Sequence, residues 1–418
     1  MRVSKKFYFV FSGLALGLFV WIIFNDLIFL GLSAALILFL LANFLIAIFS
    51  IRGIDFYRRS SIHNHFAFSI FEETFSIINN SRTKKFWVEI NDLSKLGTRI
   101  SSRVATNLKP HKEYRFKQSM LLLKRGKYSL GPTEIISGDL FGIFINKKIF
   151  TAEDELTVYP NVFLINHLWG NPAQRIGGEF IEAISTASTT QAAGIREYAP
   201  GDPLNRVHWP YSLKHRRLIV KEFDDDKQAN LWILLDIEEG RHFLNKSDPV
   251  SKSYKYYSRK SATEEFKSIP DSFDYAVSIA ASLANFVIKK RFAAGLITQD
   301  EKGVFLKPEK GDEHLYQILE ELATISPSKN LSLCEAIGDL LMDIPEGSSI
   351  VIITACQQDE LDEICEAAIL KNLHLTVIYI NSKSFDMSIG KKENVQVSAK
   401  MAPLIHINFG DNLQEKFE

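Results

Sequence analysis

The sequence has few cysteines and no excess of either charge. It contains 3 cysteines in 418 residues, and Lys plus Arg equals Asp plus Glu at 49 each. Cys334, Cys356 and Cys365 form neither a CxxC pair nor an even disulfide set, which is typical of a reducing compartment and of small buried hydrophobic side chains. The balanced charge supplies no basic field for nucleic acid and no acidic tail, so no nucleic-acid partner is expected.

Common enzyme motifs are also missing. The chain has no GxxxxGK[ST] phosphate loop, no GxGxxG after a strand, no HExxH helix and no GxSxG elbow. Its histidines are scattered, and His63 with His65 alternate along one expected strand without further ligands. We therefore assign no catalytic residue and expect the protein not to be an enzyme.

Two long apolar runs open the sequence. Phe7 to Phe24 is uninterrupted, and Leu27 to Phe49 is broken only by Asn43 and small residues. Each run is long enough to cross a membrane, which takes about 20 helical residues. The short turn between the runs has no basic residue, whereas both flanks do: Arg2, Lys5 and Lys6 come before, and Arg52, Arg58 and Arg59 after.

This charge pattern predicts the topology. Because basic residues stay on the cytoplasmic side, we expect a two-helix transmembrane anchor over 1–52, with both ends and all later residues in the cytoplasm. The expected location is the inner or plasma membrane, and the lipid bilayer is the first expected partner. A cleaved signal peptide is the alternative interpretation.

Short alternating runs follow over 60–165. Examples are 65–70, 85–90 and 114–116, separated by turn-forming clusters at 79–81, 91–92 and 109–111. No amphipathic helix of useful length interrupts them. This spacing predicts an all-β sandwich domain.

From 229 to 418, apolar strands alternate with helical patterns. The expected strands are 231–236, 292–298, 349–354, 373–380 and 404–409, and the expected helices are 273–289, 312–323, 332–342 and 360–371. This alternation predicts an α/β, Rossmann-type domain with a mostly parallel sheet covered on both faces. The polar insertion between Arg241 and Pro270 has no apolar periodicity; we expect a variable surface loop, or else a docking or anionic-headgroup segment.

The connector at 166–228 contains a dense polar stretch from Gly194 to Trp209. Asp202 suits a helix N-cap, Pro203 suits the first helical position, and Gly201 suits the turn before them. The stretch therefore predicts a rigid turn that leads into a short helix.

Three interpretations stay open for the charged residues of this stretch, Arg196, Glu197, Asp202, Arg206 and His208. They form a polar network between domains, a surface for a partner, or a catalytic His–Asp pair, for which no nucleophile is suitably spaced. In the first interpretation Arg196 and Asp202 hold the turn through a charge-assisted hydrogen bond, and Trp209 packs beneath it. In the second, His208 faces the partner.

Residue by residue, the stretch resembles the signature of the domain-of-unknown-function 58 (DUF 58) family, G-x-R-x-Y-x-x-G-D-x-x-R-x-I-H-W. Only the Ile before His-Trp is changed, to Val207. Segments 125–132 and 138–144 are similar to two further family segments, with Leu140 in place of a proline. The resemblance implies a membrane-anchored protein with a von Willebrand A-like domain. It implies signature or partner-binding roles for Arg196, Tyr198, Gly201, Asp202, Arg206, His208 and Trp209.

The resemblance also implies where a divalent metal would lie. Von Willebrand A-like domains hold Mg²⁺ with D-x-S-x-S after the first strand, a later threonine and a later aspartate. Asp236 remains, but Glu238 and Gly240 replace the serines, Ser332 is at best a hydroxyl stand-in, and Ala355 occupies the later aspartate position. Because Mg²⁺ needs about six oxygen ligands, we expect a degenerate site at Asp236, Glu238 and Ser332 that binds Mg²⁺ weakly or not at all, and no other cofactor.

Two functions follow from these observations. The first is a non-enzymatic, membrane-tethered interaction or adaptor protein that works with a MoxR-type AAA+ ATPase in assembly or cell-envelope processes. The resemblance implies this partner, because family members are commonly encoded beside such ATPases. The alternative is a metal-dependent ligand-binding or hydrolytic von Willebrand A-like module that uses Asp236, Glu238 and Asp202. A weaker third option is an accessory factor for cell-surface polymer or protease systems.

Overall fold

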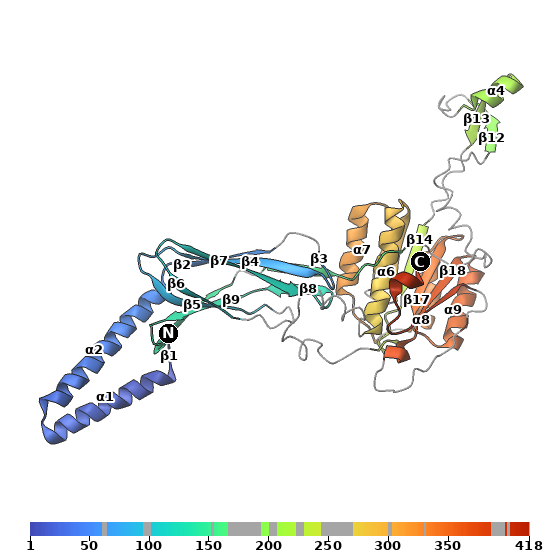
Figure 1. Cartoon of the computed structure of the whole chain (residues 1–418). Coiled ribbons are helices and arrows are strands. Elements are labelled where there is room, and N and C mark those ends of the chain that lie inside the picture. The colour runs from blue at the N-terminus through green and yellow to red at the C-terminus, as the bar shows by residue number, and fades with distance from the viewer. Residues whose placement is uncertain are drawn as a thin grey trace. The chain divides into compact units, whose positions relative to one another are not determined.

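The computed structural model describes residues 1–60, 65–94, 102–151, 154–165, 194–199, 207–222, 230–243, 271–299, 303–329, 332–385, 398 and 402–417. The chain divides into two compact units, Met1–Val158 and Tyr159–Glu418 (Figure 1). Each unit is described by itself. Most of the predicted connector, and the predicted insertion after residue 243, lie outside the described residues.

Two apolar helices begin the first unit, as predicted. They are α1 (Lys5–Phe24) and α2 (Leu27–Ser50). The side chains of Ser4 and Asp26 cap them by accepting hydrogen bonds from backbone N–H groups of the first turn. Both helices are long and apolar enough to cross a membrane, although a signal sequence near the N-terminus passes the same test of length and composition.

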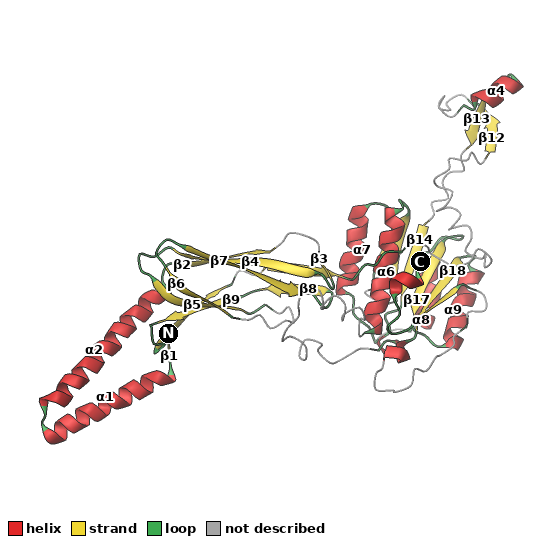
Figure 2. Ribbon diagram, in the orientation of Figure 1, coloured by secondary structure: helices red, strands yellow, loops and turns green. Residues whose placement is uncertain are grey.

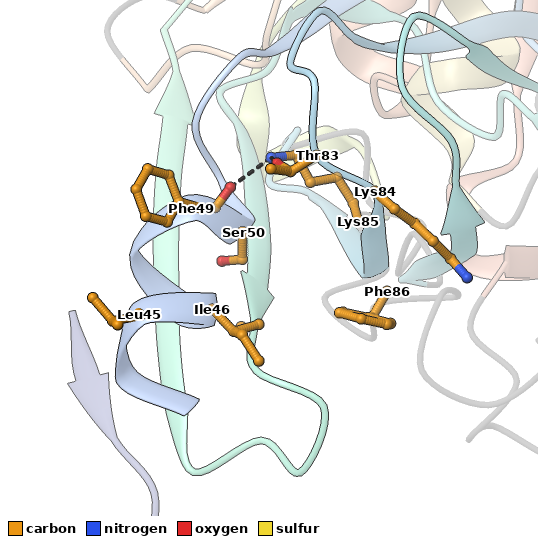
Figure 3. Close-up of a pocket in the computed structure, with 9 residues that line it drawn as sticks. Leu45, Ile46, Phe49, Ser50, Thr83, Lys84, Lys85 and Phe86 are labelled. Atoms are coloured by element: carbon orange, nitrogen blue, oxygen red, sulfur yellow. Dashed lines mark hydrogen bonds between the residues drawn. The ribbon is translucent and has the colours of Figure 1, made fainter. Parts of the chain in front are cut away.

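Both ends of this helical hairpin are bonded to β-strands of the same unit. Strand β1 (Arg2–Val3), which precedes α1, pairs with β10 (Phe144–Phe150). At the end of α2, the Lys85 ammonium donates to the Phe49 carbonyl oxygen at 2.5 Å (Figure 3). The Asn146 amide donates to the Ala47 carbonyl oxygen at 2.6 Å. These donors satisfy carbonyls that the last turn of a helix leaves unpaired.

Three sheets make up the rest of the first unit (Figure 2). Their strand orders are β1-β10-β9-β5-β6, β2-β4-β7 and β3-β11-β8. The strands not yet given are β2 (Ile54–Ser60), β3 (His65–Phe66), β4 (Ile70–Asn79), β5 (Lys85–Asp92), β6 (Arg103–Leu108), β7 (Glu113–Leu121), β8 (Gly126–Leu130), β9 (Thr133–Gly138) and β11 (Asp154–Tyr159).

Two of these sheets share one apolar core. Its members come from the β2-β4-β7 sheet and from the five-stranded sheet: Ile54, Ile77, Val88, Ile90, Leu108 and Ile135. Burial along β4 alternates with period two, so that Ile77 reaches this core and Phe71 reaches a second apolar core with Leu130 and Val158. The predicted all-β domain is therefore present. It begins at β2, before the predicted residue 60, and the predicted turn at 91–92 is wrong because both residues belong to β5.

The second unit contains a six-stranded sheet in the order β16-β15-β14-β17-β18-β19. The strands are β14 (Asn230–Leu235), β15 (Ala293–Thr298), β16 (Phe305–Glu309), β17 (Ser349–Thr354), β18 (His374–Ile380) and β19 (Leu404–Ile407). The helices are α6 (Ser272–Lys289), α7 (Asp312–Thr324), α8 (Leu333–Met342), α9 (Gln358–Leu370) and α10 (Leu413–Lys416), with short 3₁₀ turns at Glu239–Arg241 and Ser382–Phe385.

Helices cover both faces of this sheet, as fully apolar strands predict. Alternate β14 residues, Trp232 and Leu234, join a core with α8 and α9, while α6 contacts β14, β15 and β17. Figure 1 shows α6 and α7 on one side of the sheet and α8 and α9 on the other. The predicted elements are found to within about two residues. The prediction missed β16, an antiparallel edge strand that contains Pro308.

A buried ion network links two sheets of the first unit. The Arg58 guanidinium on β2 binds both Glu73 carboxylate oxygens, at 2.6 and 2.8 Å, and reaches Asp92 Oδ2 on β5 at 3.0 Å. All three side chains are nearly inaccessible, at 6%, 0% and 2% exposure. Arg58, counted in the sequence as a membrane-flanking cation, therefore pairs with carboxylates inside the β unit.

Replacing Arg58 with Met leaves two carboxylates buried without a cation. We expect Arg58→Met to lower the stability of the β unit by about 3–5 kcal/mol, read as faster hydrogen exchange in β2 and β4. The neighbouring Arg59 is exposed, so Arg59→Met should stay within about 0.5 kcal/mol of the native protein. If lost charge compensation is the cause, the triple variant Arg58→Met/Glu73→Gln/Asp92→Asn should recover protection. Equal effects of the two single variants would contradict the assignment.

Candidate functional site

Asp236 follows β14 at the carboxyl edge of the parallel sheet. The last β14 residue, Leu235, pairs with Thr298 of β15 and with Ile353 of β17, so the chain after all three strands meets at this edge. Such an edge is where open α/β sheets bind ligands. The Asp236 side chain is fully buried there.

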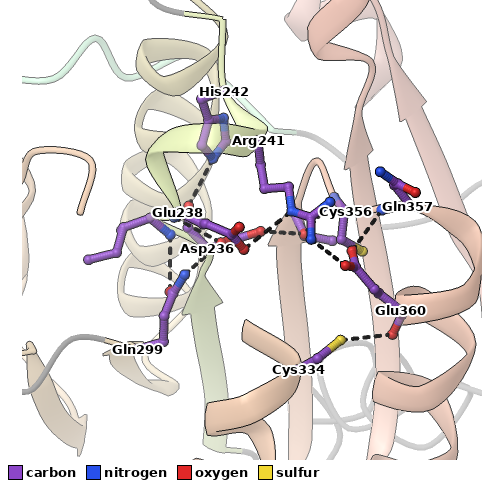
Figure 4. A network of polar contacts seen from close by, with 11 residues as sticks. Asp236, Glu238, Arg241, His242, Gln299, Cys334, Cys356, Gln357 and Glu360 are labelled. Atoms are coloured by element: carbon purple, nitrogen blue, oxygen red, sulfur yellow. Dashed lines mark hydrogen bonds and ion pairs between the residues drawn. The ribbon is translucent and has the colours of Figure 1, made fainter. Parts of the chain in front are cut away.

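Both oxygens of the Asp236 carboxylate are bonded by the protein itself (Figure 4). The Thr354 hydroxyl donates to Oδ2 at 2.6 Å, and the Gln299 side-chain amide donates to Oδ1 at 2.6 Å. The Glu238 backbone N–H also donates to Oδ1, at 3.1 Å. Gln299 uses its own oxygen to accept from the Ile237 backbone N–H at 3.0 Å. Charge-assisted hydrogen bonds of this kind stabilise a carboxylate out of water.

Arg241 bridges the Asp236 loop to α9. Its guanidinium contacts Glu238 Oε2 at 3.2 Å and also pairs with Glu360. Burial lowers the pKa of Arg241, but the hydrogen bonds and charges of Glu238 and Glu360 outweigh it and raise the pKa overall. Glu360 also accepts from the Gln357 backbone N–H at 3.1 Å, at the start of α9. Glu238 is therefore committed to an ion pair and leaves Asp236 to its neutral partners.

His242 lies on the other side of the same loop. Its Nε2 is 3.0 Å from the Asp236 backbone oxygen, and its Nδ1 is 3.4 Å from the Ser272 hydroxyl. Burial lowers the pKa of His242, against the opposing charge of Asp236. A neutral ring that donates from Nε2 and accepts at Nδ1 fits both contacts. His242 therefore connects the loop to the first residue of α6.

The thiols near this network are protonated at neutral pH. Burial raises the pKa of Cys356 to about 12 and that of Cys334 to about 11. Nucleophilic cysteines need the thiolate, which sites with lowered pKa values supply. Neither thiol meets this requirement. The network instead consists of charged and polar side chains that contact one another.

The structure places a different hydroxyl beside Asp236 from the one expected. Thr354, rather than Ser332, supplies the hydroxyl beside Asp236. Ser332 is the N-cap residue of α8, where its side chain makes no capping hydrogen bond. Among the residues that the structure describes, no group of three or more His, Cys, Asp or Glu side chains could hold a metal ion. The weak or absent Mg²⁺ binding at Asp236 stays a prediction.

Sequence reasoning missed Gln299, Thr354, Arg241, His242 and Glu360. Gln299 directly follows β15, and Thr354 is the last residue of β17. The positions of these strand ends would have predicted that both residues lie at the edge near Asp236. Nothing in residue spacing predicts which of these polar side chains contacts the carboxylate. That contact depends on the register of the sheet and on side-chain direction.

The described part of the signature segment is a small antiparallel pair with a helix. Strands β12 (Gly194–Glu197) and β13 (Ile219–Glu222) pair, with Arg196 opposite Val220, and α4 spans Trp209–His215. The Tyr198 N–H donates to the Leu218 carbonyl oxygen at 2.9 Å. Gly201, Asp202, Pro203 and Arg206 lie outside the described residues, so the predicted turn is not described.

Trp209 differs from its predicted role, whereas the partner-facing role of His208 stays a prediction. His208 is the N-cap of α4, and its Nδ1 accepts from the Tyr211 N–H at 3.3 Å. Trp209 is 56% exposed and Leu213 is 77% exposed. The prediction that Trp209 packs beneath the turn is therefore wrong for this structure. His208 holds the helix start, and Trp209 presents its ring to solvent.

No family model matches the chain. The protein is similar to an uncharacterized protein, YeaD, of Bacillus subtilis (strain 168), with 23% identity over 307 residues. The match covers 70% of this chain and 66% of that relative, slightly less than two thirds of its length.

Similarity to solved structures is low. The CARDB domain of the PF1109 protein from Pyrococcus furiosus, in complex with di-metal ions, has 11% identity and a TM-score of 0.20, covering 25% of this chain and 91% of that chain. The sporulation control protein Spo0M from Bacillus subtilis has 12% identity and a TM-score of 0.17, covering 35% and 58%. These TM-scores carry no argument about fold or function.

The Asp236–Thr354 contact generates a direct test. Thr354→Val keeps the shape of the side chain but leaves Asp236 Oδ2 and the Cys356 N–H without their hydroxyl partner. We expect it to destabilise the α/β unit by about 1–3 kcal/mol, measured by hydrogen exchange of β14 and β17. Thr354→Ser keeps the hydroxyl and is the matched control. Native protection in the Val variant would show that this hydroxyl does not hold the edge.

Proposed function

We propose that the protein is a membrane-anchored, non-enzymatic interaction protein of the DUF 58 type, with a metal-independent von Willebrand A-like domain. The observation that carries the proposal is the Asp236 carboxylate, whose two oxygens accept hydrogen bonds from Thr354 and Gln299. In von Willebrand A-like domains the corresponding carboxylate binds a cation. Here a cation would have to displace those donors in a buried position.

The exposed side chains of α4 support an interaction role. Trp209, the last residue of the stretch that resembles the DUF 58 signature, and Leu213 are 56% and 77% exposed on this short helix. Trp is enriched among the residues that dominate binding energy at interfaces. We propose a MoxR-type AAA+ ATPase as the partner that covers this helix, in assembly or cell-envelope processes.

The two apolar helices support the anchor. Exposed cations flank them at Arg2, Lys5, Lys6, Arg52 and Arg59, and the turn between them contains Asp26. The positive-inside rule then places both ends of the hairpin in the cytoplasm of a cell with an inner or plasma membrane. The β and α/β units follow on that side.

The orientation has a direct measurement. A reporter fused after Glu418 should be active only in the form that works in the cytoplasm, because both flanks of the hairpin are basic. The intact mass of the purified protein should include residues 1–52, whereas a cleaved signal sequence would remove them. Reporter activity on the outer side would contradict the assignment.

Partner capture tests the function itself. Full-length protein in native-membrane extracts should retain a MoxR-type ATPase, and the pair Trp209→Ala and Leu213→Ala should weaken purified complex formation. Truncating a central binding residue costs about 2 kcal/mol or more, roughly thirtyfold in Kd. Leu370→Ala is the matched control, because Leu370 is 88% exposed on α9. His208→Ala is less informative, since it also removes the α4 cap.

The metal-dependent module is the second candidate, because Asp236 stands where a von Willebrand A-like domain binds its cation. Calorimetry with Mg²⁺ on the full chain separates the two functions. We expect no site tighter than about the millimolar level of weak sites. A stoichiometric tighter site, lost in both Asp236→Ala and Thr354→Val, would favour the metal-dependent module instead.

A further inference from the structure

A pocket of about 410 Å³ lies at the end of the second apolar helix (Figure 3). Its walls come from the last turns of α2, the start of β5 and the end of β9: Leu45, Ile46, Phe49, Ser50, Thr83, Lys84, Lys85, Phe86 and Gly138. In Figure 3, Ile46 projects from α2 toward Phe86, whereas the Ser50 hydroxyl donates back to the Ala47 carbonyl oxygen of the same helix. The pocket therefore joins the surface of an apolar helix to the edge of a β unit.

The depth of this pocket relative to a bilayer follows from the length of α2. The helix has 24 residues, which is about 36 Å at 1.5 Å per residue, against a hydrocarbon core of about 30 Å. If α2 spans the bilayer, its last turns lie where acyl chains meet headgroups. Leu45 and Phe49 are 48% and 46% exposed there. One mouth of the pocket is then continuous with the surface that lipid tails cover.

Exposed cations lie in the lining of the pocket and in the two turns next to it. The lining contains Lys84, whose side chain is exposed, and none of its members is acidic. Arg52 lies with its guanidinium carbon 5.2 Å from the Phe49 ring centre, and Arg82 is exposed in the turn beside Thr83. The Asn80 N–H donates to the Gly53 carbonyl oxygen at 2.7 Å, which holds these two turns together.

The nearest acid of these turns is already engaged. The Asp55 carboxylate accepts from the Asn80 side-chain amide at 2.6 Å. Lys85 is also committed, because its buried ammonium donates to the Phe49 carbonyl oxygen and lies 3.2 Å from the Thr83 hydroxyl. Lys84, Arg52 and Arg82 are the exposed cations that remain for a ligand. Their charge complements an anion.

We propose that this pocket binds one anionic phospholipid of the cytoplasmic leaflet. An acyl chain packs along Ile46 and Phe86, and the phosphate lies at Lys84, while Arg52 and Arg82 add positive charge from the neighbouring turns. A free phosphate would leave the apolar walls uncovered, and a zwitterionic headgroup would bring its own cation toward Lys84. The inference rests on the proposed membrane anchor, because only a spanning α2 brings the pocket to the bilayer surface.

Native mass spectrometry of the full chain tests this site. The protein is released from nanodiscs that contain equal amounts of phosphatidylglycerol and phosphatidylcholine, and bound lipid is identified. We expect one phosphatidylglycerol per chain, and at least about a fivefold loss in Lys84→Glu, since one surface cation changes anionic-lipid affinity by roughly that factor. Lys117→Glu is the matched control, because Lys117 is exposed on β7 and does not line the pocket.

A second variant probes the apolar wall. Ile46→Trp should fill the pocket and displace the lipid. Leu38→Trp, at a residue of α2 that is 69% exposed and outside the lining, should leave it bound. Soluble glycerol phosphate should not compete, because it lacks the acyl chain. Equal retention of both lipids, or loss of lipid in Lys117→Glu equal to that in Lys84→Glu, would overturn the site.

A failure of the proposed membrane anchor gives a different result from a failure of the lipid site. A protein released from membranes by alkaline carbonate without detergent contradicts the spanning helices and, with them, the lipid site. A protein that stays in the membrane but shows no preference for phosphatidylglycerol contradicts only the lipid site.

Discussion

The carboxyl edge of the parallel sheet depends on how the Asp236 charge is kept out of water. A buried carboxylate is costly unless hydrogen bonds compensate it. Three donors supply this compensation, one from the Asp236 loop itself, one from the chain after β15 and one at the end of β17. A single group therefore ties together segments that arrive at the edge through different crossovers. The sheet ends in a closed polar network at the place where related architectures bind ligands.

Because the Asp236 carboxylate already has its partners, the surface of the protein is the better place to look for a binding site. Arg241 pairs with both Glu238 and Glu360 beside Asp236, and burial raises the pKa values of the nearby thiols. Both oxygens of the Asp236 carboxylate accept hydrogen bonds from the chain itself, which leaves this carboxylate little capacity for a ligand. The exposed α4 residues have the opposite character, since apolar side chains in water gain from being covered. These exposed side chains are the observation that supports the proposed interaction role.

The sequence predicts this fold well where a side-chain period decides it. The α/β helices and strands follow from apolar spacing, and the two N-terminal helices follow from the length of their apolar runs. The prediction fails where tertiary context decides. Arg58 looks like a membrane-flanking cation until Glu73 and Asp92 come together around it from distant strands. Trp209 was expected to be buried because large aromatic side chains usually are, but α4 leaves it exposed.

The candidate site, like the fold, could be predicted only in part. Strand ends predict which residues reach the edge, so Asp236 could be located from the sequence. The choice of Thr354 over Ser332 as its hydroxyl partner could not, because spacing along the chain carries no information on side-chain direction across a sheet. The β16 edge strand escaped prediction for a related reason. Its Pro308 argues against a strand, although an edge position tolerates the missing N–H.

The attachment of the helical hairpin to the β unit has a consequence for how the protein meets its partners. Strand β1 enters the sheet directly before α1, and β2 begins four residues after α2 ends. A long flexible linker would let a tethered domain sample a broad hemisphere of orientations. Short, hydrogen-bonded junctions at both helix ends remove that freedom for the β unit. A membrane-bound β unit would then diffuse in two dimensions with one side always turned to the bilayer. It would meet partners at the membrane surface more often, and it would not meet partners that need the side turned to the bilayer.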